Sequence, residues 1–116
     1  MDFERLEVWR RSSKLCVEVI RQFDGITLYG FRDQICRSAL SIPSNIAEGM
    51  ERNFPKEKYK FLSYAKGSCG ELRTQLYIGA ELGFIASEVA NQSIEETKEI
   101  SAMLAGLMKR IGRGAV

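Results

Sequence analysis

Apolar residues recur at intervals of three and four along four separate segments of the chain, and this periodicity limits what the sequence can fold into. Residues at these intervals share one face of an α-helix, whereas a half-buried strand needs strict alternation. The pattern predicts helices at about residues 4–23, 31–52, 55–82 and 87–111. Long helices joined by short turns run antiparallel to their neighbours. We therefore expect an all-α fold, a left-handed up-down-up-down four-helix bundle that forms a single domain over residues 1–116.

Each expected helix has one apolar face, which we assign to a shared core. The assigned positions are Leu6, Trp9, Ser13, Cys16, Ile20 and Phe23 in the first segment, Phe31, Ile35, Ser38, Ile42, Ile46 and Gly49 in the second, Tyr59, Leu62, Ala65, Cys69, Leu72, Leu76 and Gly79 in the third, and Ala90, Ile94, Thr97, Leu104, Leu107 and Ile111 in the fourth. Packing these four faces together gives one core.

Proline and glycine residues modify two of these helices. Pro43 removes a backbone hydrogen bond and its ring clashes with the preceding turn, so we expect the second helix to be kinked near residues 39–43. Gly67, Gly70 and Gly79 each cost about 1 kcal/mol relative to alanine inside the third helix. We expect a close helix approach at these glycines to offset that cost.

The sequence contains no histidine, which narrows the possible chemistry. Ser-His-Asp and Cys-His nucleophiles, histidine-ligated zinc and the Glu-x-x-His pairs of di-iron bundles all require one. Cys16, Cys36 and Cys69 are widely spaced and odd in number, which favours reduced core thiols over a disulfide framework, with redox or metal chemistry as the alternative. No cofactor motif is present. We expect a non-enzymatic protein with no catalytic residues, no metal site and no cofactor.

The start of the chain and its hydropathy favour a cytoplasmic protein. Met1-Asp2-Phe3-Glu4 lacks the basic start and the apolar run of a secretory signal. No apolar stretch approaches the roughly 20 residues that a membrane-spanning helix needs. We therefore expect a cytoplasmic location and no membrane contact.

The charge balance permits only local binding of anions. Seventeen Lys and Arg residues against 15 Asp and Glu residues give a net charge of +2, too small to attract nucleic acid from every side. The basic excess lies in residues 53–83, mainly at Lys56, Lys58, Lys60 and Lys66. An ordinary solvated helix face is the alternative interpretation of these lysines.

Polar residues form a second line on the second and third segments, again at helical spacing. The line consists of Arg37, Ser41, Asn45, Glu48 and Arg52 on one segment and of Tyr64, Ser68, Glu71 and Gln75 on the other. An antiparallel hairpin turning near residues 53–55 brings three pairs face to face, namely Arg37 with Glu71, Ser41 with Ser68, and Asn45 with Tyr64. Two interpretations of these polar residues remain open. Either they all form hydrogen bonds and ion pairs with one another and so fix the register of the hairpin, or Arg37 and Arg52 stay free to bind a phosphate or a partner.

Several short segments of the chain form a recognisable pattern. The most specific is the run Ser-Ile-Pro-Ser-Asn-Ile-Ala-Glu-Gly at residues 41–49. The others are Leu6-Glu7-Val8-Trp9, residues 34–39, Phe61-Leu62 and Ala65-Lys66-Gly67-Ser68, followed by Glu71-Leu72 and Gln75-Leu76. With these segments the chain resembles, over almost its whole length, the four-helix-bundle proteins encoded in intervening sequences of bacterial 23S ribosomal RNA genes.

The resemblance implies a homopentamer with a role in binding RNA or DNA. The same family includes the accessory protein of diversity-generating retroelements, a barrel-shaped homopentamer that contacts a reverse transcriptase and nucleic acid. The sequence departs from the family pattern at Arg73, where an acidic or neutral residue is common, and at Cys36, where a second arginine is common. The change at Cys36 leaves the surface with one basic residue fewer.

Two functions are therefore expected as alternatives. The first is a non-enzymatic, oligomeric nucleic-acid-binding protein, with RNA as the expected ligand, that contacts phosphates without reading bases. Five copies would carry about +10 in total, and binding of several weak basic patches to one strand would raise the overall affinity. Its candidate contacts are Arg32, Arg37, Arg52, Lys56, Lys58, Lys60 and Lys66. The alternative is a protein-interaction scaffold that docks onto a reverse transcriptase or a ribosome-associated factor through Phe3, Trp9 and Phe54.

Overall fold

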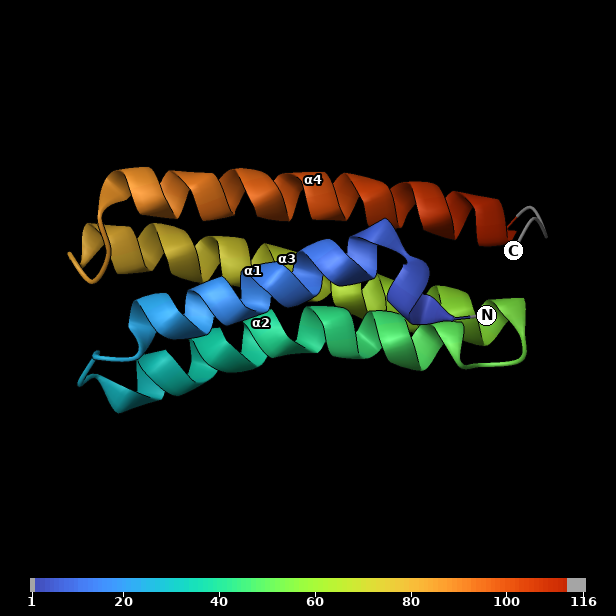
Figure 1. Cartoon of the computed structure of the whole chain (residues 1–116), viewed down its shortest axis with the longest axis horizontal. Coiled ribbons are helices and arrows are strands. Elements are labelled where there is room, and N and C mark those ends of the chain that lie inside the picture. Colours follow the sequence, from blue (N-terminus) through green and yellow to red (C-terminus); the bar gives the residue numbers. More distant parts are fainter. Residues whose placement is uncertain (1, 113–116) are drawn as a thin grey trace.

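Four long helices account for most of the chain in the computed structural model, which describes residues 2–112 (Figure 1). A short 3₁₀ helix, η1 (Phe3–Arg5), is followed by α1 (Glu7–Phe23), α2 (Tyr29–Met50), α3 (Pro55–Glu81) and α4 (Ser87–Gly112). No strand occurs within residues 2–112. The prediction of an all-α fold with four helices packed against one another is confirmed.

Each turn reverses the direction of the chain. The α1–α2 and α3–α4 turns therefore lie at one end of the molecule, and the α2–α3 turn lies at the other end, together with η1 and the end of α4 (Figure 1). α1 packs on α2, α2 on α3 and α3 on α4, while α1 and α4 share the smallest of these four interfaces. The molecule measures 45 × 21 × 20 Å, so its two ends are well separated surfaces.

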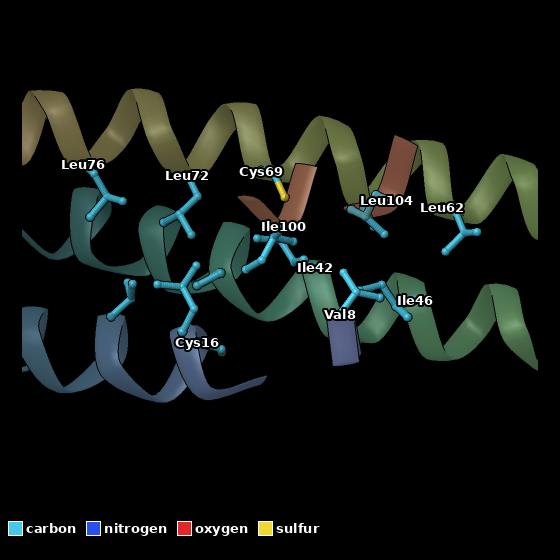
Figure 2. Packing of buried hydrophobic residues seen from close by; sticks show 14 of the residues in the cluster. Val8, Cys16, Ile42, Ile46, Leu62, Cys69, Leu72, Leu76, Ile100 and Leu104 are labelled. Atoms are coloured by element: carbon cyan, nitrogen blue, oxygen red, sulfur yellow. The ribbon is translucent and has the colours of Figure 1, made fainter. Parts of the chain in front are cut away.

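Aliphatic side chains fill the space between the helices along the whole bundle. Ile42 of α2, Leu72 of α3 and Ile100 of α4 are fully buried there, and their side chains lie between the ribbons (Figure 2). The core faces predicted for α2 and α4 are buried apart from Phe31, which is half-buried, and that of α3 is buried apart from Tyr59, which is 46% exposed. The assignment of Tyr59 to the core is therefore wrong.

The face that α1 turns to the core only partly overlaps the predicted one. Cys16 and Phe23 are buried as predicted, and the half-buried Leu6 and Trp9 pack against the core. Ile20 is 40% exposed, so its assignment to the core is wrong, and Ser13 is only half-buried. The residues that α1 buries are Val8, Ser12, Leu15, Cys16, Val19 and Phe23. The helix carries two overlapping apolar stripes, and helical spacing alone does not distinguish the inner stripe from the outer one.

α2 is a continuous helix that runs through Pro43. Its ribbon changes direction near the middle of the helix (Figure 1). Beside the proline, the amide nitrogen Nδ2 of Asn45 donates a hydrogen bond of 2.8 Å to the carbonyl oxygen of Ser41. The kink at residues 39–43 and the left-handed twist of the bundle stay predictions.

The glycines of α3 lie in two different environments. A Cβ atom on Gly79 would lie 3.1 Å from ring atoms of Phe23, so the predicted close helix approach occurs at this position. A Cβ atom on Gly67 or Gly70 would meet nothing within 4 Å. The close approach predicted at these two glycines is therefore wrong, and both lie on the outer face of the helix.

Candidate nucleic-acid interface

A hydrogen bond between two serines crosses the seam between α2 and α3. The hydroxyl oxygens of Ser41 and Ser68 lie 2.6 Å apart, which confirms the predicted facing of these two residues. The Ser41 hydroxyl also lies 2.9 Å from the carbonyl oxygen of Ser38. The middle of the predicted polar line is thus satisfied within the bundle.

The rest of the predicted polar line does not form the expected pairs. Within residues 2–112, no ion pair joins Arg37 to Glu71, and both side chains are exposed. Asn45 bonds within its own helix, and Tyr64 is 50% exposed. The Oε1 atom of Gln75 is buried without a hydrogen-bond partner in the described part of the chain. The polar network is therefore shorter than predicted.

Two polar contacts that sequence spacing did not reveal hold α4 to the other helices. Arg11 of α1 donates hydrogen bonds from Nε to Glu96 at 2.9 Å and from Nη2 to Glu99 at 2.8 Å. The bond to Glu96, and then that to Glu99, raise the pKa of Arg11 above its ordinary value. Arg73 of α3 donates from Nε to the buried Thr97 hydroxyl at 3.0 Å. These partners are far apart in the sequence, so no local pattern links them.

Basic side chains gather at the end of the bundle that holds the α2–α3 turn. Residues 43–66 and 102–112 contain seven Lys and Arg residues against three acidic ones, whereas residues 29–42 and 67–101 contain four against seven. We call the first surface the basic end. Its basic residues are Arg52, Lys56, Lys58, Lys60, Lys66, Lys109 and Arg110.

Two of these basic side chains also stabilise the α2–α3 turn. The Arg52 guanidinium lies over the Phe61 ring, 4.7 Å from its centroid, and pairs with Glu48 at 2.9 Å. Lys58 is half-buried and donates from Nζ to the carbonyl oxygen of Met50 at 3.0 Å, at the last residue of α2. A lysine at a helix C-terminus satisfies one of the carbonyls that lack a partner within the helix.

The other lysines of the basic end project from the surface. Lys56, Lys60, Lys66 and Lys109 are exposed, and within residues 2–112 none of them forms an ion pair. Lys66 and Lys109 line one shallow hollow between α3 and α4. Lys109 was not among the predicted contact residues, and it joins this surface because the end of α4 lies beside the first half of α3.

Arg32 and Arg37 lie away from the basic end. Arg32 is near the start of α2, and the helical rise of 1.5 Å per residue separates it from Arg52 by about 30 Å. Its guanidinium lies 4.9 Å from the centroid of the Tyr29 ring and 3.9 Å from the carboxylate of Asp33. Five of the seven predicted contact residues therefore share one surface, and these two arginines do not.

A second surface is an apolar groove between α1 and α2. It has a volume of about 310 Å³ and is lined by Phe3, Trp9, Ser13, Leu40, Pro43, Ser44 and Ala47. The Phe3 and Trp9 rings pack edge to face at 5.3 Å, and Leu40 is 55% exposed. On α1, the apolar surface continues beyond this groove to Val17 and Ile20, which are 47% and 40% exposed. We call Trp9, Val17 and Ile20 the outer stripe of α1.

The cysteines are all free thiols. Cys16 and Cys69 are buried, as predicted, and Cys36 is half-buried. Burial raises the pKa of all three thiols, and that of Cys69 to about 12. Within the described residues, no three His, Cys, Asp or Glu side chains form a group that could hold a metal ion. None of the helices in that range is long and apolar enough to span a membrane.

Comparison with known proteins places the chain in a family. The family model described as 23S rRNA-intervening sequence protein matches residues 4–106. No curated protein matches the sequence. The fold is similar to the crystal structure of a protein with unknown function from the S23 ribosomal protein family of Bacteroides thetaiotaomicron, with a TM-score of 0.83 and 21% identity over 88% of this chain and 98% of that chain. Because the match to the family model covers most of its length, the chain belongs to the 23S rRNA-intervening sequence protein family.

Proposed function

We propose that this protein is a non-enzymatic, oligomeric RNA-binding protein that contacts phosphates through its basic end. The observation that carries the proposal is the uneven charge within residues 29–112, with seven basic residues against three acidic ones in the part at this end and four against seven in the remainder. Residues 2–12, at the same end, add three basic and three acidic residues and leave the excess unchanged. Neutralisation of backbone phosphates supplies most of the affinity of sequence-independent nucleic-acid binding. A local basic surface can therefore bind RNA although the whole chain carries only +2.

Four lysines are the principal candidates for phosphate contacts. Lys56, Lys60, Lys66 and Lys109 are exposed, and none is held in an ion pair within residues 2–112. A lysine ammonium is a point charge on a flexible stem, so it binds phosphate without demanding one geometry. Such contacts position a strand without reading its sequence. The family is named after intervening sequences of 23S rRNA, which is the reason for testing RNA first.

We further infer that the protein acts as a homo-oligomer, and the family resemblance implies a pentamer. The outer stripe of α1 and the neighbouring groove support this inference, because Trp9, Val17 and Leu40 leave apolar surface open to solvent. Several basic ends in one assembly would bind one RNA strand far more tightly than a single copy does.

A protein-interaction scaffold is the second candidate function. The same groove supports it, since the edge-to-face pair of Phe3 and Trp9 offers the kind of aromatic anchor that protein interfaces use. Phe54 is 66% exposed at the α2–α3 turn. Recovery of one partner protein after nuclease treatment would favour this function, and recovery of nucleic acid alone would count against it.

A salt titration of RNA binding tests the first proposal. Fluorescence anisotropy with a labelled RNA should show an affinity that falls steeply with salt, and the slope of log K against log salt should decrease by about 0.7 for each phosphate contact that is removed from a single strand. Lys60→Glu and Lys66→Glu should each weaken binding and lower this slope. Lys98→Glu is the control for the change of charge, because Lys98 is also exposed, pairs within residues 2–112 only with Glu95 of its own helix and lies outside the basic end.

Two results would overturn this proposal. One is an affinity that does not respond to salt, or no binding at low salt. The other is a loss of binding in Lys98→Glu as large as the loss in Lys60→Glu, which would show that the basic end has no special role.

A further inference from the structure

Aromatic rings are exposed on the basic end, among its lysines. Phe54 is 66% exposed, Tyr59 is 46% exposed and Tyr64 is 50% exposed. The other exposed aromatic side chains in the described residues, Tyr29 and Tyr77, lie toward the opposite end of the bundle. Exposed rings beside positive charges are the combination that proteins use to bind unpaired nucleotides, because every base has a flat face that stacks.

Tyr64 is held in place by its neighbours but stays open to solvent. Its ring packs edge to face on Phe61, with centroids 5.7 Å apart and an interplanar angle of 89°. Phe61 is itself covered by the Arg52 guanidinium at 4.7 Å. The Nζ atom of Lys60 lies 5.9 Å from the Tyr64 centroid. This packing limits the motion of the Tyr64 ring and places a positive charge beside it.

Tyr59 lies on the other flank of α3 and lines the hollow between α3 and α4. The hollow has a volume of about 420 Å³, and Ser63 and Lys66 of α3 line it together with Lys109 of α4. Its charged side chains are both lysines, so a negatively charged group meets no carboxylate there. The ring and the two ammonium groups therefore face the same open space.

The two tyrosines flank the outer face of α3. They are five residues apart, so their side chains differ by about 140° around the helix axis and by about 7.5 Å along it. Lys60 and Gly67 lie between these two directions on the helix surface. A Cβ atom on Gly67 would meet nothing within 4 Å, so no side chain projects from the outer face at this position and the surface there is open. A strand that crosses α3 here can reach both rings with its backbone over Lys60.

We propose that the basic end binds single-stranded RNA by stacking unpaired bases on Tyr59 and Tyr64, with phosphates held by Lys60, Lys66 and Lys109. The inference rests on the proposed function and adds the class of RNA, because a duplex hides its base faces and cannot stack on side chains. A protein partner fits less well, since its contact with these rings would desolvate the neighbouring lysines.

Binding of a short labelled oligouridine and of an RNA duplex of equal length, followed by anisotropy at low salt, tests this inference. Removing one stacking ring costs between about 5-fold and about 150-fold in affinity. Tyr59→Ala and Tyr64→Ala should each weaken binding of the oligouridine within this range and leave binding of the duplex unchanged. Tyr59→Phe and Tyr64→Phe keep the ring and should bind as the wild type does.

Tyr77→Ala is the matched control. Tyr77 is on the same helix and is 53% exposed, but it lies far from the lysines of the basic end. Its replacement should leave both affinities unchanged. Circular dichroism of each variant checks that the helices are intact, which the exposure of the three tyrosines leads us to expect.

The outcomes separate this inference from the proposed function. If Lys60→Glu and Lys66→Glu weaken RNA binding while the tyrosine-to-alanine variants do not, stacking is overturned and the phosphate-binding function stands. If the wild type binds neither RNA, the proposed function fails and the inference fails with it. If the alanine variants instead reduce the mass of the assembly in sedimentation, the rings lie between copies of the chain and stacking is overturned.

Discussion

The hydroxyl oxygens of Ser41 and Ser68 lie 2.6 Å apart and join the middle of α2 to the middle of α3. Ser68 is 8% exposed, so its hydroxyl has little access to water as an alternative partner. A buried polar group that loses its partner costs more than the hydrogen bond itself contributes. The pair therefore favours one register of the α2–α3 hairpin over its neighbours.

Removing either hydroxyl should destabilise the fold. Ser41→Ala and Ser68→Ala should each lower the free energy of unfolding by about 1 kcal/mol, and the double variant should lose less than the sum of the two. Urea denaturation of the four proteins measures this coupling. Ser63→Ala, on the exposed face of α3, is the control and should have little effect. Additive losses would show that the two hydroxyls do not interact in solution.

Alanine in place of the outer glycines of α3 should stabilise the protein. A Cβ atom on Gly67 or Gly70 meets nothing within 4 Å, and alanine is a better helix former than glycine. Gly67→Ala and Gly70→Ala should each raise the free energy of unfolding by about 0.5–1 kcal/mol. Thermal or urea denaturation measures the change, and no gain at either position would place that glycine in a contact outside the chain.

Gly49 should respond in the opposite sense. Its added Cβ atom would lie 3.0 Å from the Cβ atom of Phe61 and 3.2 Å from the carbonyl oxygen of Lys58, and a backbone carbonyl cannot move aside cheaply. Gly49→Ala should therefore lower the free energy of unfolding by about 1–3 kcal/mol. A stabilising effect at Gly49 would contradict the observed closeness of α2 and α3.

Cys69 should make stability depend on pH in the alkaline range. Burial raises the pKa of its thiol from 9.0 to about 12, so above pH 9.0 the unfolded chain releases a proton that the folded chain keeps. This contribution to stability is complete below pH 9.0 and is lost as the pH rises, at up to about 1.4 kcal/mol per pH unit. The difference in unfolding free energy between the wild type and Cys69→Ala should therefore shift against the wild type above pH 9.0. A constant difference would mean that the thiol is not shielded from water.

Arg11 should couple the first helix to the last. The Arg11 and Glu96 side chains are 28% and 27% exposed, so water weakens their attraction without removing it. A double-mutant cycle of Arg11→Met and Glu96→Gln should give a coupling of about 1 kcal/mol that becomes smaller at high salt. Lys98 and Glu95, an exposed pair within α4, provide the control cycle and should couple more weakly. Equal couplings would show that Arg11 adds nothing specific to the α1–α4 interface.

The number, type and approximate limits of the helices were predictable, because each is long and has a regular apolar face. The side of α1 that faces the core was not, because Ile20 and Val19 both belong to apolar stripes and only packing against α2 and α4 separates them. The same limit applies to Gly67, whose helical position is compatible with a crowded crossing or with an open surface. Periodicity locates faces on a helix but does not say which face meets another helix.

The candidate site was predictable only in part. The lysines at the start of α3 are close in sequence, and their clustering is visible there. Lys109 joins them only because α4 ends beside the start of α3, and Arg32 is excluded only because α2 carries it to the opposite end. Within the part of the chain that the structure describes, Arg37 and Glu71 do not form the predicted ion pair; both are exposed to water, where an ion pair gains little.

Ultraviolet crosslinking of a thiouridine-containing single-stranded RNA, followed by mass spectrometry of the crosslinked peptides, tests most directly whether the basic end holds RNA. We predict crosslinks within residues 54–66 and 105–110, and their loss in the Tyr59→Ala, Tyr64→Ala double variant. Crosslinks confined to α1 or to the opposite end, at residues 28–37 and 77–82, would contradict the assignment of RNA binding to this surface.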